Sequence, residues 1–362
     1  MSIPSAALWI GTYPTAGQAP GTGEGIWRVA IGGHGKFAGA ELVAPVASPS
    51  YLALDPSGRT LLAVSEVDSG GISSFRVPDD GALAPAGAAA TGGSSPCHVV
   101  ATDTAAWVTN YGDGVVAAVA LSTTGALGEP RTHRHTGSGP VAGRQEGSHA
   151  HFAHVWGDRV LVADLGTDEL RSYPLDGALL LDDAATSGGE VAAVLPPGTG
   201  PRHLVELPDG TILLVGELDC RLHVLVPAGP GRLEHVGSVA ITGRTMPDGA
   251  AGYPSHITVA GDLVHVGVRG PDVLSVLRVR PAAAGTDDAV TAGHLTINNV
   301  SDVDLGAGAW PRHHALLADG GVVVVAAQNA DALIAVRLDP TTGQGEITDR
   351  LELPVPACVL EA

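Results

Sequence analysis

The chain has 362 residues, and its 50 glycines and 26 prolines lie between short apolar runs rich in Val, Leu and Ala. This distribution predicts many strands joined by turns, a pattern that closed all-β folds of this length accommodate within one domain. The formal charge is −19 and Lys36 is the only lysine, which excludes the basic surface that nucleic acids and anionic membranes require.

The cysteines and the N-terminal segment indicate the compartment. Three cysteines, an odd and sparse number, do not make a disulfide framework and are typical of a reducing environment. The first residues, MSIPSAALWIGTY, lack the basic and apolar regions of a signal peptide, and no run of about 18 apolar residues is present to span a bilayer. We therefore expect a cytoplasmic protein, a monomer or weak homo-oligomer, with no nucleic-acid or membrane partner.

One phrase recurs along the chain. It reads Pro, any residue, often His, an apolar run, a turn, and a second apolar run that ends in a polar residue. The copies begin, in chain order, at Pro49, Pro96, His149, Pro201, Pro254, Pro311 and Pro356. The last copy stops at the end of the chain, and its missing half stands at the other end as LWIGT from Leu8. The spacing of about 45 to 57 residues suits the four-stranded blade of a β-propeller.

Further apolar runs complete each module. A third run follows every copy, as in GIWRVAI, GISSFRV and ALIAVRL, and a weaker fourth follows, as in ELVAPV and LEHVGSVA. The sequence thus predicts an all-β, seven-bladed β-propeller of four antiparallel strands per blade, with residues 1–362 as a single domain. The strand from Pro356 is expected to complete the blade formed by residues near 6 to 46, because this pairing removes an open sheet edge.

Two sets of polar residues recur in the repeat. The start of the first strand of a blade lies beside the end of the antiparallel second strand, so both sets are expected to face one mouth of the central channel. The third position of the first strand holds Tyr51, His98, His151, His203, His256, His313 and Cys358. The end of the second strand holds Thr12, Glu66, Asn110, Asp164, Glu217, Arg269 and Gln328.

These polar residues have a structural alternative, because repeated polar side chains at strand ends also satisfy turns and contacts between blades. For any one of the histidines the two interpretations are equally weighted. The second set, however, places carboxylates on some blades and Arg269 on another, and variation of this kind inside a symmetric repeat indicates function.

Arginines gather at the same predicted mouth. Arg202 and Arg312 occupy the second position of the phrase, and Arg144 lies in the segment RQEGSHAH before the third copy. With Arg269 they suit the carboxylate or phosphate group of a small ligand. Their structural alternative is ion pairing with Glu66, Asp164 or Glu217.

At these residues the chain resembles the lactonase family of seven-bladed propellers, which includes the propeller-type 6-phosphogluconolactonases and the 3-carboxy-cis,cis-muconate lactonizing enzymes. The similar phrases are IGTY, PSYLALDPSGRTLLAVSE, PCHVV with VTNYGDG, RQEGSHAHF, VADLGTDEL, GPRHLVELPDG and PRHHALLADGG with AAQNAD. The resemblance implies a site of one His, two Arg and one Glu, which falls on His151 (or His149), Arg202, Glu217 and Arg269. The other candidate substrate-binding residues are Arg144, His149, His98, His203, His256, Arg312, His313, Glu66 and Asp164.

The first functional hypothesis is hydrolysis of a sugar lactone such as 6-phosphogluconolactone, in carbohydrate metabolism and without a cofactor or metal. His151 or Glu217 would act as the base, while Arg202 and Arg269 would hold the oxyanion and the anionic group of the substrate. The second is cycloisomerisation of a muconate-like dicarboxylate in the same pocket.

Two further alternatives are a metal-dependent lactonase and a non-catalytic binding platform. The platform would need exposed aromatic or apolar blade loops. A metal would take oxygen ligands or the histidines of the H-x-H-x-x-H pattern. These candidate ligands are Glu66, Asn110, Asp164, Glu217, His149, His151 and His154.

Three other patterns are interpreted as structural. The segment GTGEG from Gly21 resembles a phosphate-binding loop, but no helix is expected after it, so it is assigned to a turn. The basic cluster RTHRH from Arg131 to His135 is expected on the solvated edge of an outer strand. Cys97 and Cys358 flank the predicted mouth and are expected to be small buried side chains.

Overall fold

The computed structural model describes residues 6–14, 25–32, 35–78, 82–175, 188–246, 248–282, 290–317 and 321–362. These described residues form strands in seven sheets, and paired strands within them run antiparallel. The one 3-10 turn among them is η2 (Gln328–Ala330). In six of the seven sheets the strands follow one another in sequence order, apart from an added hairpin in one, so most connections are local.

One compact unit comprises Ile10–Trp27 and Leu42–Pro201 and contains three complete four-stranded sheets. Its first sheet is β4 (Leu52–Leu54), β5 (Thr60–Ser65), β6 (Gly71–Arg76) and β7 (Ala84–Ala90). Its second is β8 (Pro96–Ala101), β9 (Ala105–Asn110), β10 (Val116–Leu121) and β11 (Leu127–His133). Its third is β12 (Ala150–Trp156), β13 (Arg159–Asp164), β14 (Glu169–Pro174) and β15 (Glu190–Val194).

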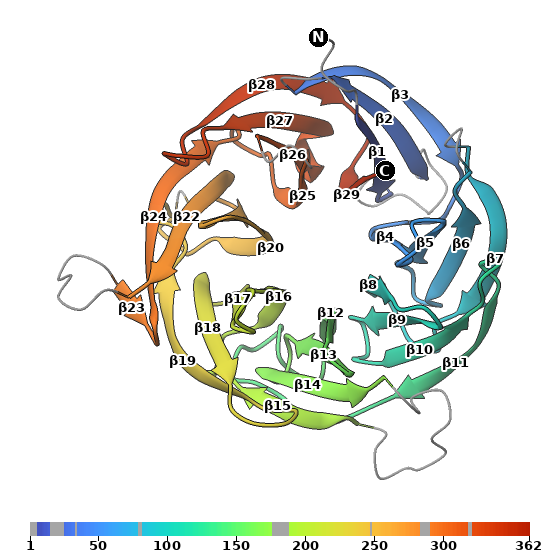
Figure 1. The fold of residues 1–362 in the computed structure, drawn as a ribbon, viewed down its shortest axis with the longest axis horizontal. Coiled ribbons are helices and arrows are strands. Elements are labelled where there is room, and N and C mark those ends of the chain that lie inside the picture. The colour runs from blue at the N-terminus through green and yellow to red at the C-terminus, as the bar shows by residue number, and fades with distance from the viewer. Residues whose placement is uncertain are drawn as a thin grey trace. The chain divides into compact units, whose positions relative to one another are not determined.

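The other unit comprises Met1–Trp9, Arg28–Glu41 and Arg202–Ala362 and holds the next three sheets (Figure 1). The first is β16 (Pro201–Glu206), β17 (Ile212–Gly216), β18 (Arg221–Pro227) and β19 (Leu233–Ala240). The second is five-stranded, with β20 (Tyr253–Ala260), β21 (Leu263–Arg269), β22 (Val273–Pro281), β24 (Leu295–Asp304) and β23 (Val290–Ala292) in spatial order. The third is β25 (Pro311–Leu316), β26 (Val322–Ala327), β27 (Ala332–Leu338) and β28 (Gly345–Glu352).

The seventh sheet joins the two ends of the chain. Its order is β29 (Pro356–Glu361), β1 (Ala6–Thr12), β2 (Ile26–Gly32) and β3 (Lys36–Ala44). The backbone N–H of Ala362 donates to the carbonyl of Ala7 at 2.9 Å, which extends the pairing to the end of the chain. This confirms the expected closure of the N-terminal sheet by the C-terminal strand.

Burial explains why some strands are easier to predict than others. Second strands such as β17 and β26 are covered on both faces and so consist of continuous runs of Val, Leu, Ile or Ala. The outermost strands, such as β11 and β28, are half exposed and mix polar with apolar residues. The weaker fourth signal in the sequence therefore reflects partial solvation of that strand.

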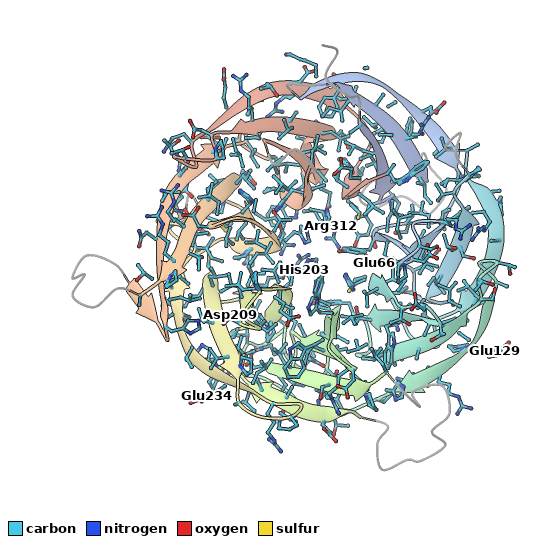
Figure 2. The ribbon with its side chains drawn as sticks, in the orientation of Figure 1. Glu66, Glu129, His203, Asp209, Glu234 and Arg312 are labelled. Atoms are coloured by element: carbon cyan, nitrogen blue, oxygen red, sulfur yellow. The ribbon has the colours of Figure 1, made fainter. Side chains whose placement is uncertain are left out.

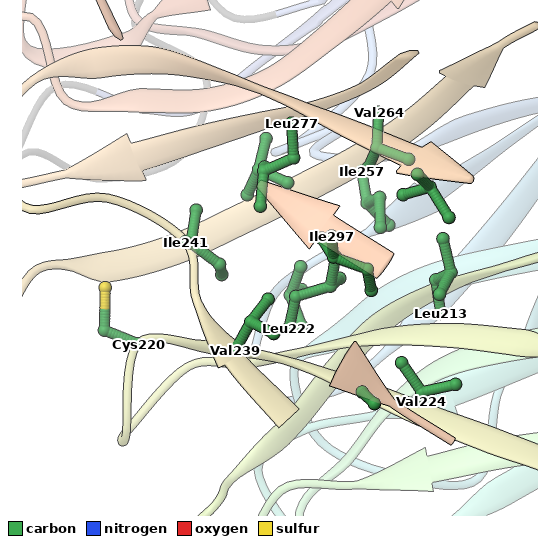
Figure 3. Close-up of a cluster of buried hydrophobic side chains, with 14 of the residues drawn as sticks. Leu213, Cys220, Leu222, Val224, Val239, Ile241, Ile257, Val264, Leu277 and Ile297 are labelled. Atoms are coloured by element: carbon green, nitrogen blue, oxygen red, sulfur yellow. The ribbon is translucent and has the colours of Figure 1, made fainter. Parts of the chain in front are cut away.

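The core between β16–β19 and β20–β24 illustrates the packing that holds neighbouring sheets together. Leu213, Leu222, Ile257 and Leu277 lie in one cluster with Ile297, all almost fully removed from water (Figure 3). Burying an aliphatic side chain of this size stabilises a fold by roughly 1.5–3 kcal/mol. Sheet packing of this kind gives the polar strand ends a rigid frame.

The structure confirms the predicted strand ends. Asn110, Asp164 and Arg269 each terminate the second strand of a sheet, and their partners at the start of the first strand are Pro96, Ala150 and Tyr253. Within the described ranges, no helix has the length and hydropathy that a membrane-spanning helix requires.

Candidate functional site

A buried charge cluster joins β16–β17 to β21. Oε2 of Glu217, which directly follows β17, lies 2.6 Å from Nε of Arg202 and 2.7 Å from Nη2 of Arg269. The side chains of Arg202, Glu217 and Arg269 are only 3%, 6% and 8% exposed. We call these three residues the Arg–Glu–Arg cluster. Ion pairs removed from water in this way are favourable only where their geometry is well defined.

Backbone carbonyls of β20 hold the two guanidiniums. Nε of Arg269 donates to the carbonyl of Tyr253 at 3.0 Å, and Arg202 donates to the carbonyl of Ser255. The pairing of β20 with β21 is irregular between Pro254 and Ile257, and such a bulge leaves carbonyls outside the regular ladder. The start of β20 is thus shaped to fix both arginines, which sequence reasoning did not foresee.

Aromatic side chains adjoin the cluster. The indole of Trp310 lies over the Arg269 guanidinium at 5.5 Å, and the ring of Tyr253 lies 6.3 Å from Trp310. Neither aromatic residue was among the sequence candidates. The available signal was that Tyr253 and Trp310 both stand immediately before a motif proline, where other copies carry Ser48, Ser95, Gly200 or Val355.

Three of the predicted histidines meet in a buried row. Nδ1 of His203 lies 2.8 Å from Nδ1 of His256, so one ring donates and the other accepts. The rings of His256 and His313 stack with centroids 3.8 Å apart, and Nδ1 of His313 accepts the backbone N–H of Val359 at 3.3 Å. His203 and Arg312 are labelled in Figure 2, each on the first strand of its sheet. The structure therefore brings these three histidines together. Arg312, which directly precedes His313 in the sequence, is half-buried.

Two further histidines lie behind this row. Oγ1 of Thr258 is 3.0 Å from Nε2 of His314 and 3.3 Å from Nδ1 of His265. Burial lowers the pKa of His265 to about 4 and lowers the pKa of His314 well below its usual range. Both imidazoles are accordingly neutral at physiological pH.

In the unit of residues 10–27 and 42–201, Asp164 anchors its own sheet. Its carboxylate is 2.8 Å from Nε2 of His135 and accepts from Ser148 Oγ and from the backbone N–H of His149. Burial raises the pKa of Asp164, but these hydrogen bonds outweigh burial and hold the pKa below its usual range. The carboxylate of Glu66 accepts from the hydroxyls of Ser50 and Tyr13.

The remaining candidates of this unit surround Tyr111. The His149 ring stacks on Tyr111 at 4.7 Å, and its Nδ1 lies 2.7 Å from the Tyr111 carbonyl, which assigns the proton to that nitrogen. The His151 ring meets Tyr111 edge-on at 5.6 Å. His98 packs between the rings of Tyr51 and Phe152, and its Nδ1 accepts the backbone N–H of Ala153. Arg144 lies half-buried in the turn before β12.

The structure tests the expectations for the basic cluster at residues 131–135 and for the two cysteines. The expected solvated outer-strand edge at residues 131–135 is confirmed for Thr132 and Arg134, which are exposed at and just beyond the end of β11. It was wrong for the two histidines: His133 is buried against Trp107 with ring centroids 6.0 Å apart, and His135 pairs with Asp164. Alternate side chains of an outer strand face the neighbouring sheet, which accounts for the burial of His133. Cys97 and Cys358 are buried thiols outside any disulfide, as expected. Most of the glycine segment from Gly21 lies outside the described residues.

The possible metal ligands are dispersed. Across the part of the chain that the structure describes, no group of three or more His, Cys, Asp or Glu side chains is arranged to hold a metal ion. The carboxylates of Glu66 and Asp164 already accept hydroxyl and imidazole donors, while Glu217 pairs with two cations. Nothing in the described geometry therefore favours a metal at these residues.

Comparison with known proteins identifies the family. Residues 7–361 match the lactonase family of seven-bladed β-propellers. The chain belongs to this family. Its fold is thus an all-β, seven-bladed β-propeller, with the seven sheets of the described residues as its blades, as the sequence predicted.

Individual relatives agree with this membership. The uncharacterized protein YwcC of Lactococcus lactis subsp. lactis is 29% identical over 332 residues, which are 88% of this chain and 89% of that protein. The periplasmic gluconolactonase PpgL of Pseudomonas aeruginosa is 26% identical with a TM-score of 0.84, covering 99% of each chain. A proposed 6-phosphogluconolactonase of Bacteroides fragilis, 22% identical with a TM-score of 0.81 over 99% of this chain and 98% of its own, shares the fold.

Proposed function

We propose that this lactonase-family protein hydrolyses a sugar lactone that carries an anionic group, of the 6-phosphogluconolactone type. The observation that carries the proposal is the Arg–Glu–Arg cluster, in which one buried carboxylate orients two guanidiniums. Guanidiniums bind phosphate and carboxylate groups with defined geometry. The likeness to the gluconolactonase PpgL supports a sugar lactone as the substrate class.

The reaction places specific demands on the site. Water adds to the lactone carbonyl, a tetrahedral oxyanion forms, and the ring C–O bond then breaks to give a hydroxy acid. Fixed cationic donors stabilise that oxyanion without reorganising during the reaction. We assign this role, together with binding of the anionic substituent, to Arg202 and Arg269.

Glu217 and His151 take different roles in this proposal. Oε2 of Glu217 is ion-paired with both arginines, so Glu217 is assigned to positioning the guanidiniums rather than to activating water. The base is then assigned to His151 on the sequence argument alone, with His149 as its alternative. A cytoplasmic location and a monomeric or weakly associated state remain part of the proposal.

The test measures acid release by the purified protein from 6-phosphogluconolactone and from glucono-1,5-lactone, corrected for spontaneous opening, with and without EDTA. We expect Arg202→Met and Arg269→Met to lower kcat/KM by about 100-fold or more. The matched control is Arg221→Met, because Arg221 of the same sheet bonds to Ser238 on the outer strand at 2.7 Å. His151→Asn and His149→Asn separate the two candidate bases.

Several results would redirect the assignment. If neither lactone is opened faster than in buffer, the proposed hydrolysis is wrong, and loss of muconate absorbance then tests cycloisomerisation of a dicarboxylate held by the same two arginines. Activity that EDTA abolishes and a divalent ion restores would favour the metal-dependent alternative. Full activity in both arginine variants would remove the Arg–Glu–Arg cluster from the reaction.

A further inference from the structure

Trp310 departs from the repeat that surrounds it. The residue before the motif proline adopts a positive φ in several copies, with values of 46°, 53° and 51° at Ser48, Ser95 and Trp310 and 38° at Val355. In the copy of β16 the residue is Gly200, with φ of 61°. This left-handed conformation is unfavourable for bulky and β-branched side chains, so Trp310 and Val355 are both unexpected at the position.

The fold needs this backbone conformation but not the indole. Oδ1 of Asp272 accepts the backbone N–H of Trp310 at 2.9 Å, and Oδ1 of Asp168 accepts the N–H of Gly200 at 2.8 Å in the same arrangement. A carboxylate therefore fixes the turn equally well whether the residue is glycine or tryptophan. The indole itself has no counterpart at Gly200, and the blade repeat does not explain it.

The indole does contact the candidate site. Trp310 lies over the guanidinium of Arg269 at 5.5 Å, within the range of a cation–π contact. The ring of Tyr253 is tilted 48° to the indole at 6.3 Å, and the carbonyl of Tyr253 accepts from Nε of the same arginine. Both aromatic side chains are half-buried, so each keeps part of its surface accessible.

We propose that Trp310 and Tyr253 form an aromatic wall beside Arg269 that binds the C–H face of a cyclic sugar substrate. The inference rests on the proposed function and names the feature of the substrate that this site selects: a saturated ring that offers an apolar face next to an anionic or polar edge. Small-molecule sites commonly combine such an aromatic surface with a few fixed polar groups. Trp310 is then a specificity-determining residue, and its stacking also orients Arg269.

The variants exploit the repeat. Trp310→Gly recreates the residue that the equivalent turn already carries at Gly200, so it removes the indole while relieving the positive φ. Val355→Gly is the matched control, because it makes the same backbone change in another copy, where Asp331 holds the N–H of Val355 at 2.9 Å. Trp310→Phe retains an aromatic face without the indole.

The measurement uses 1,5-anhydroglucitol 6-phosphate, a ring analogue that lacks the reactive carbonyl, with isothermal titration calorimetry and tryptophan fluorescence. We expect Trp310→Gly to weaken its binding by about tenfold and Val355→Gly to leave binding unchanged, since an aromatic contact of this kind contributes about one factor of ten. Trp310→Phe is expected to retain binding while losing the fluorescence change. Lactone kinetics on the same proteins should show the loss in KM more than in kcat.

The outcomes separate this proposal from the proposed function. Ring-analogue binding that depends on Trp310, in a protein without lactone turnover, supports the aromatic wall and overturns the hydrolysis. Equal binding by the original protein and Trp310→Gly, or equal weakening in Val355→Gly, overturns the aromatic wall even if the lactone is hydrolysed. Failure of the original protein to bind the ring analogue also overturns it.

Discussion

Replacing Glu217 by glutamine tests the central feature of the candidate site, since it removes one negative charge and preserves the shape of the side chain. In the original protein that charge faces both Arg202 and Arg269, and all three side chains are less than a tenth exposed. The variant therefore leaves two buried guanidiniums without their shared carboxylate, at a place where water cannot replace it.

The expected loss of unfolding free energy is about 3–5 kcal/mol, the range for removing one partner of a buried ion pair. The double variant Glu217→Gln/Arg269→Gln should recover part of the lost unfolding free energy, because it removes one of the two cations that Glu217→Gln leaves without the carboxylate.

Denaturant unfolding at pH 7 measures this loss, with Glu346→Gln as the control. Glu346 pairs with Arg337 at 2.8 Å, but its side chain is 71% exposed, so we expect its replacement to cost less than about 1 kcal/mol. A loss below about 1 kcal/mol for Glu217→Gln, or a loss that disappears in high salt as it does for surface pairs, would refute the buried-cluster argument.

Three further predictions concern stability. Burial lowers the pKa of His265 to about 4, so between pH 6.5 and 4 the unfolded chain binds more protons at this residue than the folded protein does. The free energy of unfolding should therefore fall by about 3 kcal/mol as the pH drops through that window. His265→Gln should flatten this profile in pH-dependent denaturation. Asp164→Asn should lower the midpoint of thermal unfolding, because the neutral amide cannot replace the ionised carboxylate that His135 and Ser148 contact; an unchanged midpoint in calorimetry would contradict this. A chain ending before Pro356 should elute as aggregates in size-exclusion chromatography, since it leaves the edge of β1 unpaired.

The sequence predicted the strands and their order because the repeat records strand burial directly. Interior strands such as β17 and β26 are uninterrupted apolar runs, and the polar residue that ends each run marks where the sheet meets a turn. The C-terminal strand was predictable for a related reason, since its phrase lacks a second half that the residues from Leu8 supply.

The partners of the polar residues were not predictable in the same way. Asp164 meets His135, which lies beyond the end of an outer strand, and the pairing depends on the path of that loop rather than on any spacing in the sequence. Trp310 was missed because it precedes the repeated phrase, where only its comparison with Gly200 in a shared backbone conformation makes it unusual. Such contacts come from tertiary geometry, which the periodicity of single strands does not contain.

The structure also divides the carboxylates of the second polar set by the charge of their partners. Glu66 accepts from neutral hydroxyls, which is sufficient to satisfy a strand end. Glu217 instead faces two guanidiniums, so the cluster that it forms carries a formal charge of +1 in a chain whose formal charge is −19. Buried ion pairs of this kind carry a desolvation cost that can exceed their Coulombic gain, so the cluster is weak evidence for a purely stabilising role. An anionic ligand beside the two arginines would add attraction that offsets this cost, which is the physical argument for the binding function proposed for them.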